Sequence, residues 1–133
     1  MNTLTFDEQV ALLLKDLCAR LPYKVKVCLY KKETCILTGI DGHEVYLNVD
    51  SDSFRIESIK PYLRPMSSMT EEEKKYISDK CGFSISGPIG NECVLIMPVL
   101  AADWLIDFYN EHHIDYRGLI EKGLAIEAPE GMY

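Results

Sequence analysis

The chain has 133 residues, of which 47% are hydrophobic and 26% are charged, and this is the composition of one globular domain rather than of a disordered chain. Its formal net charge of −7 is unevenly distributed, because residues 1–65 carry nine Lys or Arg and nine Asp or Glu, whereas residues 66–133 carry five and twelve. No apolar run approaches the roughly 20 residues of a membrane span, and no basic segment precedes an apolar stretch at the N-terminus, so we expect a cytoplasmic protein with no signal peptide and no membrane contact.

The five cysteines are odd in number, and no two of them are spaced as Cys-x-x-Cys. A disulfide framework in a secreted chain favours an even count. We therefore expect reduced thiols, most of them buried as small hydrophobic side chains, at Cys18, Cys28, Cys35, Cys81 and Cys93.

The first predicted element is a helix that begins after Thr5. Thr5 and Glu8 have the spacing of a capping box, and Pro22 ends the helix. The apolar residues recur every three or four positions and so form one stripe, which consists of Phe6, Val10, Leu13, Leu14, Leu17 and Leu21.

Residues 24–59 predict a β-meander of four strands, because apolar and polar residues alternate between short turn signals. If the first turn has three residues, Val27 pairs with Leu37. A two-residue turn at Asp41–Gly42 then places Leu37 opposite Tyr46 and sends the apolar residues of the third strand to the other face. We therefore predict a bulge or a three-residue loop near residues 39–43. A sheet that is covered on both faces is the alternative.

Pro61 and Pro65 indicate a linker over residues 61–69. This linker joins two parts of a single domain, namely the helix and meander of residues 1–60 and a mostly helical, acidic half at 70–133. In the second half, Thr70 and Glu73 form another capping box, which begins a surface helix that ends near Gly82.

The remaining pattern predicts a loop and a buried strand over residues 82–98, then a helix from Val99 to His112. A short last helix from Tyr116 to Lys122, with Gly123 as its C-cap, precedes an edge strand at Leu124–Ile126. Together these elements predict an α+β fold. A small antiparallel sheet of four strands, with closure into an SH3-like barrel as an alternative, is packed by the N-terminal helix and the helix at 99–112.

Two surfaces are candidates for binding. Glu71, Glu72 and Glu73 favour the positive end of a helix dipole and form an acidic face suited to a basic protein surface. Lys24, Lys26 and Tyr30 are expected on one strand face, and a basic aromatic strand face is typical of single-stranded nucleic-acid binding. Because lysines also protect strand edges and the chain is acidic overall, nucleic acid is the less favoured partner.

The sequence shows no motif for catalysis, a metal or a cofactor, and we expect none of the three. His112 and His113 are adjacent, and neighbouring helix positions point about 100° apart, which does not suit one metal ion. A site assembled from Cys35, His43 and the two adjacent histidines is the remaining enzymatic alternative.

Two segments carry a resemblance: Ile59–Met66, with its Lys-Pro-Tyr-Leu-Arg-Pro sequence, and Asp115–Ile126, with Gly-Leu-Ile-Glu-Lys-Gly-Leu-Ala-Ile. In these segments the chain resembles a family of uncharacterised small proteins encoded by phages and mobile elements of gut anaerobic bacteria. The resemblance implies the same plan of helix, meander, linker and closing segment, and it transfers no activity. Within this plan we expect Arg64 to clamp the following helix and Gly123 to have a positive φ.

The resemblance also implies a genomic setting in which small accessory proteins bind host or phage proteins. We therefore expect a non-catalytic accessory factor that binds a protein partner, with a homo-oligomer compatible with the sequence. A single-stranded nucleic-acid module and an enzyme with an unrecognised site are the two alternatives.

Overall fold

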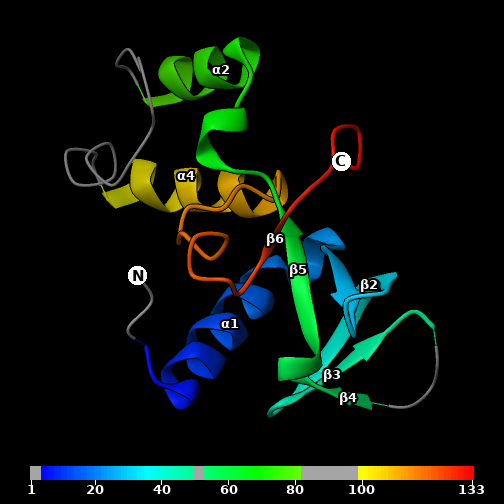
Figure 1. The fold of residues 1–133 in the computed structure, drawn as a ribbon. Helices are drawn as coiled ribbons and strands as arrows, with labels where there is room; N and C mark the ends of the chain where they lie inside the picture. The colour runs from blue at the N-terminus through cyan, green and yellow to red at the C-terminus, as the bar shows by residue number, and fades with distance from the viewer. Residues whose placement is uncertain (1–3, 50–52, 82–98) are drawn as a thin grey trace.

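The computed structural model describes residues 4–49, 53–81 and 99–133 (Figure 1). Within these ranges, six strands form one open sheet in the order β4-β3-β2-β1-β5-β6, in which only the β5–β6 pair is parallel. The strands are β1 Lys26–Leu29, β2 Glu33–Asp41, β3 Glu44–Leu47, β4 Ser53–Arg55, β5 Ile59–Leu63 and β6 Ile126–Glu127. The α+β class is confirmed, but the described residues form six strands instead of four. Within the described ranges the sheet ends at β4 and β6 and does not close into a barrel.

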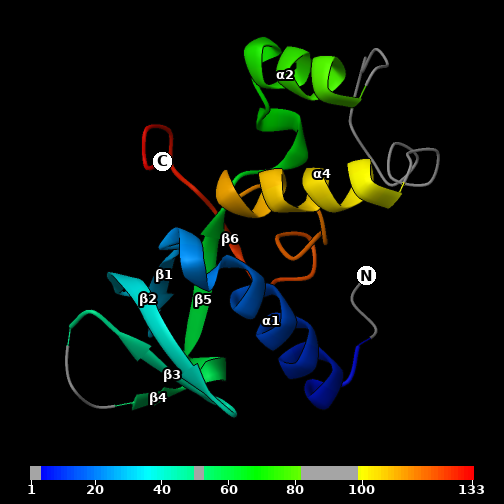
Figure 2. The same ribbon diagram turned by 180° about the vertical axis from the view of Figure 1, so that it is seen from behind.

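Helix α1, Phe6–Arg20, covers one face of the sheet (Figure 2). Its capping box is confirmed, since the Thr5 N–H donates to Glu8 Oε1 over 3.0 Å and the Glu8 N–H donates to Thr5 Oγ1 over 3.2 Å. Leu13 and Leu17 are buried against the sheet, whereas Phe6 is 60% exposed. The buried stripe therefore begins later than predicted. A 3-10 turn, η1 Leu21–Tyr23, follows the helix.

The first hairpin turns at residues 30–32, one residue earlier than predicted, so Val27 pairs with Cys35 and not with Leu37. Moving the turn by one residue changes the partner of each residue by two positions, and a two-position change keeps every side chain on its predicted face. Val27, Cys35 and Leu37 are accordingly all buried in one core.

The predicted bulge in the second hairpin is confirmed. The register shifts between Leu37 and Gly39, so that Leu37 pairs with Leu47 while Gly39 pairs with Tyr46. Because the bulge absorbs one residue, Val45 and Leu47 lie on the same buried face as Leu37.

The predicted linker over residues 61–69 is wrong in its first part, because Ile59–Leu63 forms strand β5 between β1 and β6. Burial alternates along β5, as in a strand with one face in the core, but the prolines in this part of the sequence are typical of a linker. Tyr30 N–H donates to the Ser58 carbonyl oxygen, and paired residues alternate along an antiparallel ladder, so Val27 and Pro61 form a non-hydrogen-bonded pair. The missing N–H of Pro61 therefore costs the β1–β5 ladder no hydrogen bond. Two 3-10 turns, η2 Ile56–Ser58 and η3 Met66–Ser68, flank β5.

Helix α2, Glu71–Cys81, is held by Arg64, as predicted. Arg64 Nη1 and Nη2 donate to the two carboxylate oxygens of Glu73 over 2.9 and 2.6 Å. The capping box is also confirmed, with reciprocal hydrogen bonds of 2.9 and 3.1 Å between Thr70 and Glu73. One arginine thus connects the end of β5 to the beginning of α2.

Helix α4, Val99–Glu111, lies across the end of the sheet, with α2 on its far side (Figures 1 and 2). Its buried residues belong to a second core and not to the core over the sheet, which corrects the expectation that this helix packs on the sheet. The second core consists of Met69, Ile77, Leu105, Phe108, Tyr109 and Ile114. The strand expected within residues 82–98 lies outside the described residues.

The predicted helix at residues 116–122 is wrong, because this segment is a series of turns. The buried Asp115 carboxylate accepts hydrogen bonds from the N–H groups of Leu119 (2.8 Å) and Ile120 (3.0 Å) and organises these turns. Gly123 has a φ of +74°, as expected. The turns lead into β6, which confirms an edge strand next to the predicted position.

Candidate functional site

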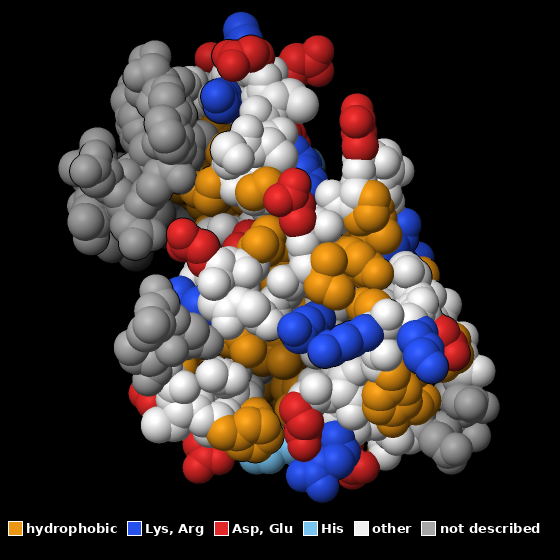
Figure 3. All heavy atoms as spheres, viewed as in Figure 1, with side chains coloured by type: hydrophobic (Ala, Val, Ile, Leu, Met, Phe, Trp, Pro, Cys, Tyr) orange, Lys and Arg blue, Asp and Glu red, His pale blue; other side chains and the backbone are white. Residues whose placement is uncertain are grey.

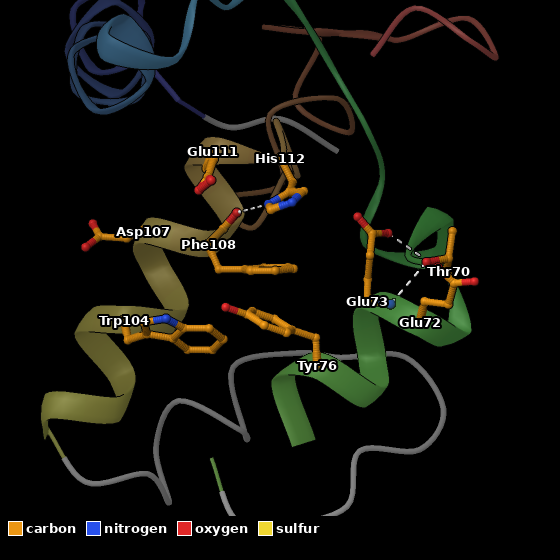
Figure 4. A pocket seen from close by; sticks show the side chains of 9 residues that line it. All are labelled: Thr70, Glu72, Glu73, Tyr76, Trp104, Asp107, Phe108, Glu111 and His112. Carbon is orange, nitrogen blue, oxygen red and sulfur yellow. Dashed lines mark hydrogen bonds between the residues drawn. The ribbon is translucent and has the colours of Figure 1, made fainter. Parts of the chain in front are cut away.

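A groove of about 440 Å³ lies between α2 and α4 (Figure 4). We call it the α2–α4 groove, and its lining residues are Thr70, Glu72, Glu73, Tyr76, Trp104, Asp107, Phe108, Glu111 and His112. The residues from α4 recur at intervals of three and four, so they share one helix face. The same holds for Glu72, Glu73 and Tyr76 on α2. The groove is therefore the line along which two amphipathic helices meet.

Aromatic rings form one wall of the groove. Tyr76 reaches from α2 toward α4, where its ring centroid lies 5.6 Å from that of Phe108 and 5.5 Å from that of Trp104 (Figure 4). Phe108 also stacks on His112, with 4.1 Å between centroids. Lys80 Nζ lies 5.8 Å from the Trp104 ring centroid. A cation at that distance is attracted by the negative ring face, so the wall already accepts one cation from its own chain.

Carboxylates line the remaining part of the groove. Glu72, Asp107 and Glu111 are exposed, and no ion pair holds them within the part of the chain that the structure describes. Glu73 is different, since the hydrogen bonds from Arg64 lower the pKa of its carboxyl group to about 2, even though partial burial acts in the opposite direction. None of the nine lining residues is Lys or Arg. The groove therefore combines aromatic surface with three carboxylates that no ion pair in the described residues compensates.

Only part of the acidic surface predicted from the sequence lies in this groove. Glu72 and Glu73 line it, whereas the Glu71 side chain is 92% exposed and lies 3.5 Å from Lys74 Nζ. Helix α4 supplies two further carboxylates to the groove, from Asp107 and Glu111.

The basic strand face predicted from the sequence is not formed. Lys24 and Tyr30 lie outside β1, and both have a positive φ, of 56° and 52°. Lys26 Nζ donates to the Met132 carbonyl oxygen over 2.8 Å and lies 5.4 Å from the Tyr133 ring centroid. Of the three residues, Tyr30 presents an open aromatic surface, with 59% of the residue exposed.

Two residues of the enzymatic alternative, Cys35 and His43, are not brought together. Cys35 is buried, and burial raises the pKa of its thiol, which disfavours the thiolate that attack would need. His43 is exposed in the turn after β2, about 20 Å along the strand from Cys35. Burial lowers the pKa of His113 to about 4. The expectation that most thiols are buried holds for Cys28 and Cys35, whereas Cys18 is exposed.

Among the described residues, no group of three or more His, Cys, Asp or Glu side chains is arranged to hold a metal ion. The helices within the same ranges are too short or too polar to cross a membrane.

The sequence interpretation missed the contribution of Tyr76 to a binding surface. The available signal was one aromatic residue on an otherwise strongly polar helix, but its contacts with Trp104 and Phe108 depend on how α2 docks on α4. No family model, no curated protein and no solved structure matches the chain.

Proposed function

We propose that this protein is a non-catalytic binding factor whose α2–α4 groove receives a basic segment of a protein partner. The observation that carries the proposal is the groove itself, where an aromatic wall lies beside four carboxylates, three of them without an ion pair within the described residues, and where no lining residue is Lys or Arg. A lysine or arginine side chain suits both features, because its apolar stem packs on the rings while its charged end meets the carboxylates.

The charge distribution supports the same proposal. The excess of acidic residues lies entirely in residues 66–133, the half of the chain that forms the groove. Charge complementarity of this kind speeds association and orients a partner more than it adds affinity. The resemblance to small proteins of phages and mobile elements favours an accessory factor that binds a host or phage protein.

The test uses Trp104, which is the only tryptophan of the chain and lines the groove. Its fluorescence is followed during titration with a blocked Gly-Arg-Lys-Arg-Gly peptide and with the matched Gly-Glu-Asp-Glu-Gly peptide. We expect a saturable change with the basic peptide that weakens as salt is added, because salt screens exposed charges. Equal responses to both peptides would contradict the proposal.

Variants locate the binding site. The triple variant E72Q/D107N/E111Q is expected to bind the basic peptide about tenfold more weakly, since each exposed ion pair contributes up to about 1 kcal/mol. The matched control E33Q/D41N/E121Q removes the same charge from exposed positions outside the groove and should bind like the wild type. Equal weakening by both triples would show that only net charge matters.

A further inference from the structure

The tip of the β1–β2 hairpin carries backbone strain at two successive residues with large side chains. Tyr30 has a φ of 52° and Lys31 a φ of 62°, and the Lys32 N–H donates to the Leu29 carbonyl oxygen over 3.0 Å. Positive φ at both central residues is the type I′ pattern, for which Asn-Gly is the favoured sequence. The chain keeps Tyr-Lys at this turn although these residues strain the backbone there.

The two strained residues line a pocket of about 360 Å³, which lies within the size range of small-molecule sites. Cys28 and Ile126 contribute apolar surface from β1 and β6, and Lys60 contributes an amine from β5. We call this cavity the hairpin-tip pocket. It therefore places an exposed aromatic ring and two lysine side chains around a partly apolar surface.

The charge of the hairpin-tip pocket is positive. Lys31 and Lys60 form no ion pair within the described residues, whereas Glu57, the acidic residue of the pocket, is held by Arg55 at 2.7 Å. Figure 3 shows Lys and Arg side chains gathered over the sheet between hydrophobic side chains. The ligand that fits is an anion that also presents a flat apolar face.

We infer that the hairpin-tip pocket binds a nucleoside phosphate, with the base stacked on Tyr30 and the phosphate held by Lys31 and Lys60. A nucleobase suits the ring of Tyr30, which is 59% exposed, and a phosphate suits two free amines. The same chemistry occurs in a free nucleotide and in one unit of a single strand. The inference is independent of the proposed function, because the α2–α4 groove shares no residue with this pocket.

This site differs from the basic face predicted from the sequence. Lys24 is absent from the pocket, and Lys26 is engaged by Met132 and Tyr133. The overall acidity of the chain does not oppose the inference, because residues 1–65 have no net charge. Two amines are sufficient for one phosphate group, whereas a long polyanion would require a larger basic surface.

The experiment measures fluorescence anisotropy of a fluorescein-labelled ten-nucleotide oligothymidylate, with unlabelled AMP and inorganic phosphate as competitors. We expect binding whose affinity falls with salt with a logarithmic slope of about −0.7, the value for one neutralised phosphate on a single strand. Competition by AMP but not by phosphate would assign the site to free nucleotides, and resistance to both would assign it to single strands. No binding of either AMP or the oligonucleotide at low salt would overturn the inference.

Variants place the ligand. Tyr30→Leu is expected to weaken binding about 5- to 150-fold, the range of one lost base stack. Lys31→Gln and Lys60→Gln should each weaken binding and reduce the salt slope, while Lys32→Gln, in the same turn but outside the pocket, should change neither. Binding that is the same in all four variants would also overturn the inference.

A turn-restoring variant separates binding from folding. Y30N/K31G supplies the favoured type I′ residues, so its melting temperature should rise by roughly 3–6 °C while nucleotide binding is lost. Loss of binding in a more stable protein cannot come from unfolding. Retention of binding in this variant would show that the side chains at the turn are not the ligand site.

Discussion

The hydroxyl of Tyr133 donates a hydrogen bond of 2.8 Å to the Tyr62 carbonyl oxygen, and the same hydroxyl accepts one of 2.9 Å from the Lys26 N–H. The β1–β5 register, with Val27 opposite Pro61, makes Lys26 and Tyr62 the next pair of that ladder. A side chain from the C-terminal segment therefore bridges two strands where their direct pairing ends. Residues 129–133 are thereby attached to the sheet.

We predict that Tyr133→Phe lowers the free energy of unfolding by about 1 kcal/mol, because two backbone groups lose a partner at a site open to water. Urea denaturation measures the change. Tyr46→Phe is the matched control, since the Tyr46 hydroxyl has no hydrogen bond within the described ranges, and its stability should change by less than about 0.5 kcal/mol. Equal effects of the two substitutions would contradict the bridging role of Tyr133.

A buried ion pair joins α1 to the turns after α4. Asp16 and Arg20 are both fully buried, and Arg20 Nε lies 2.9 Å from Asp16 Oδ2. Arg117 Nη1 lies 2.8 Å from the other carboxylate oxygen, Asp16 Oδ1. Arg20 Nη2 also donates to the Ile114 carbonyl oxygen over 2.7 Å. This network connects the core over the sheet with the second core.

We predict that Asp16→Leu destabilises the protein by about 3–5 kcal/mol, because it leaves the Arg20 charge buried without its partner. The double variant D16L/R20M should recover most of that loss, since replacing a whole buried pair by apolar residues is often close to neutral. Chemical denaturation of the single and double variants compares them. A double variant less stable than D16L would show that the positive charge of Arg20 is needed even without Asp16.

His113 makes stability depend on pH. Its ring stacks on that of Tyr133 at 3.9 Å between centroids, and its Nδ1 has no hydrogen bond within the described part of the chain. Burial, followed by the positive charge of Arg20, lowers its pKa to about 4 from the ordinary value of 6.5. Below pH 6.5 the unfolded chain binds a proton that the folded protein does not bind, so stability falls between about pH 6.5 and pH 4.

We predict that this pH window removes about 2 kcal/mol of unfolding free energy, allowing for partial screening by solvent. His113→Asn is the comparison variant, because Asn tolerates the positive φ of 59° at this position and does not titrate there. The stability difference between the wild type and this variant should shrink as the pH falls from 7 to 4. A constant difference would show that His113 titrates normally in the folded protein.

Local signals in the sequence determined much of the fold. Both capping boxes depend on residues three apart, at Thr5 and at Thr70, and both are present. The bulge after Leu37 followed from the requirement that the apolar residues of three strands share one face. Such features are set within a few residues, so the sequence alone specifies them.

The tertiary structure decided what distant residues do to one another. Pro61 is part of a strand because β1 lies beside it, and residues 116–122 form turns because the buried Asp115 carboxylate accepts two of their N–H groups. The α2–α4 groove likewise depends on Tyr76 of one helix meeting Phe108 of another. Contacts between segments far apart in sequence leave no local periodicity, and for this reason only the folded chain reveals them.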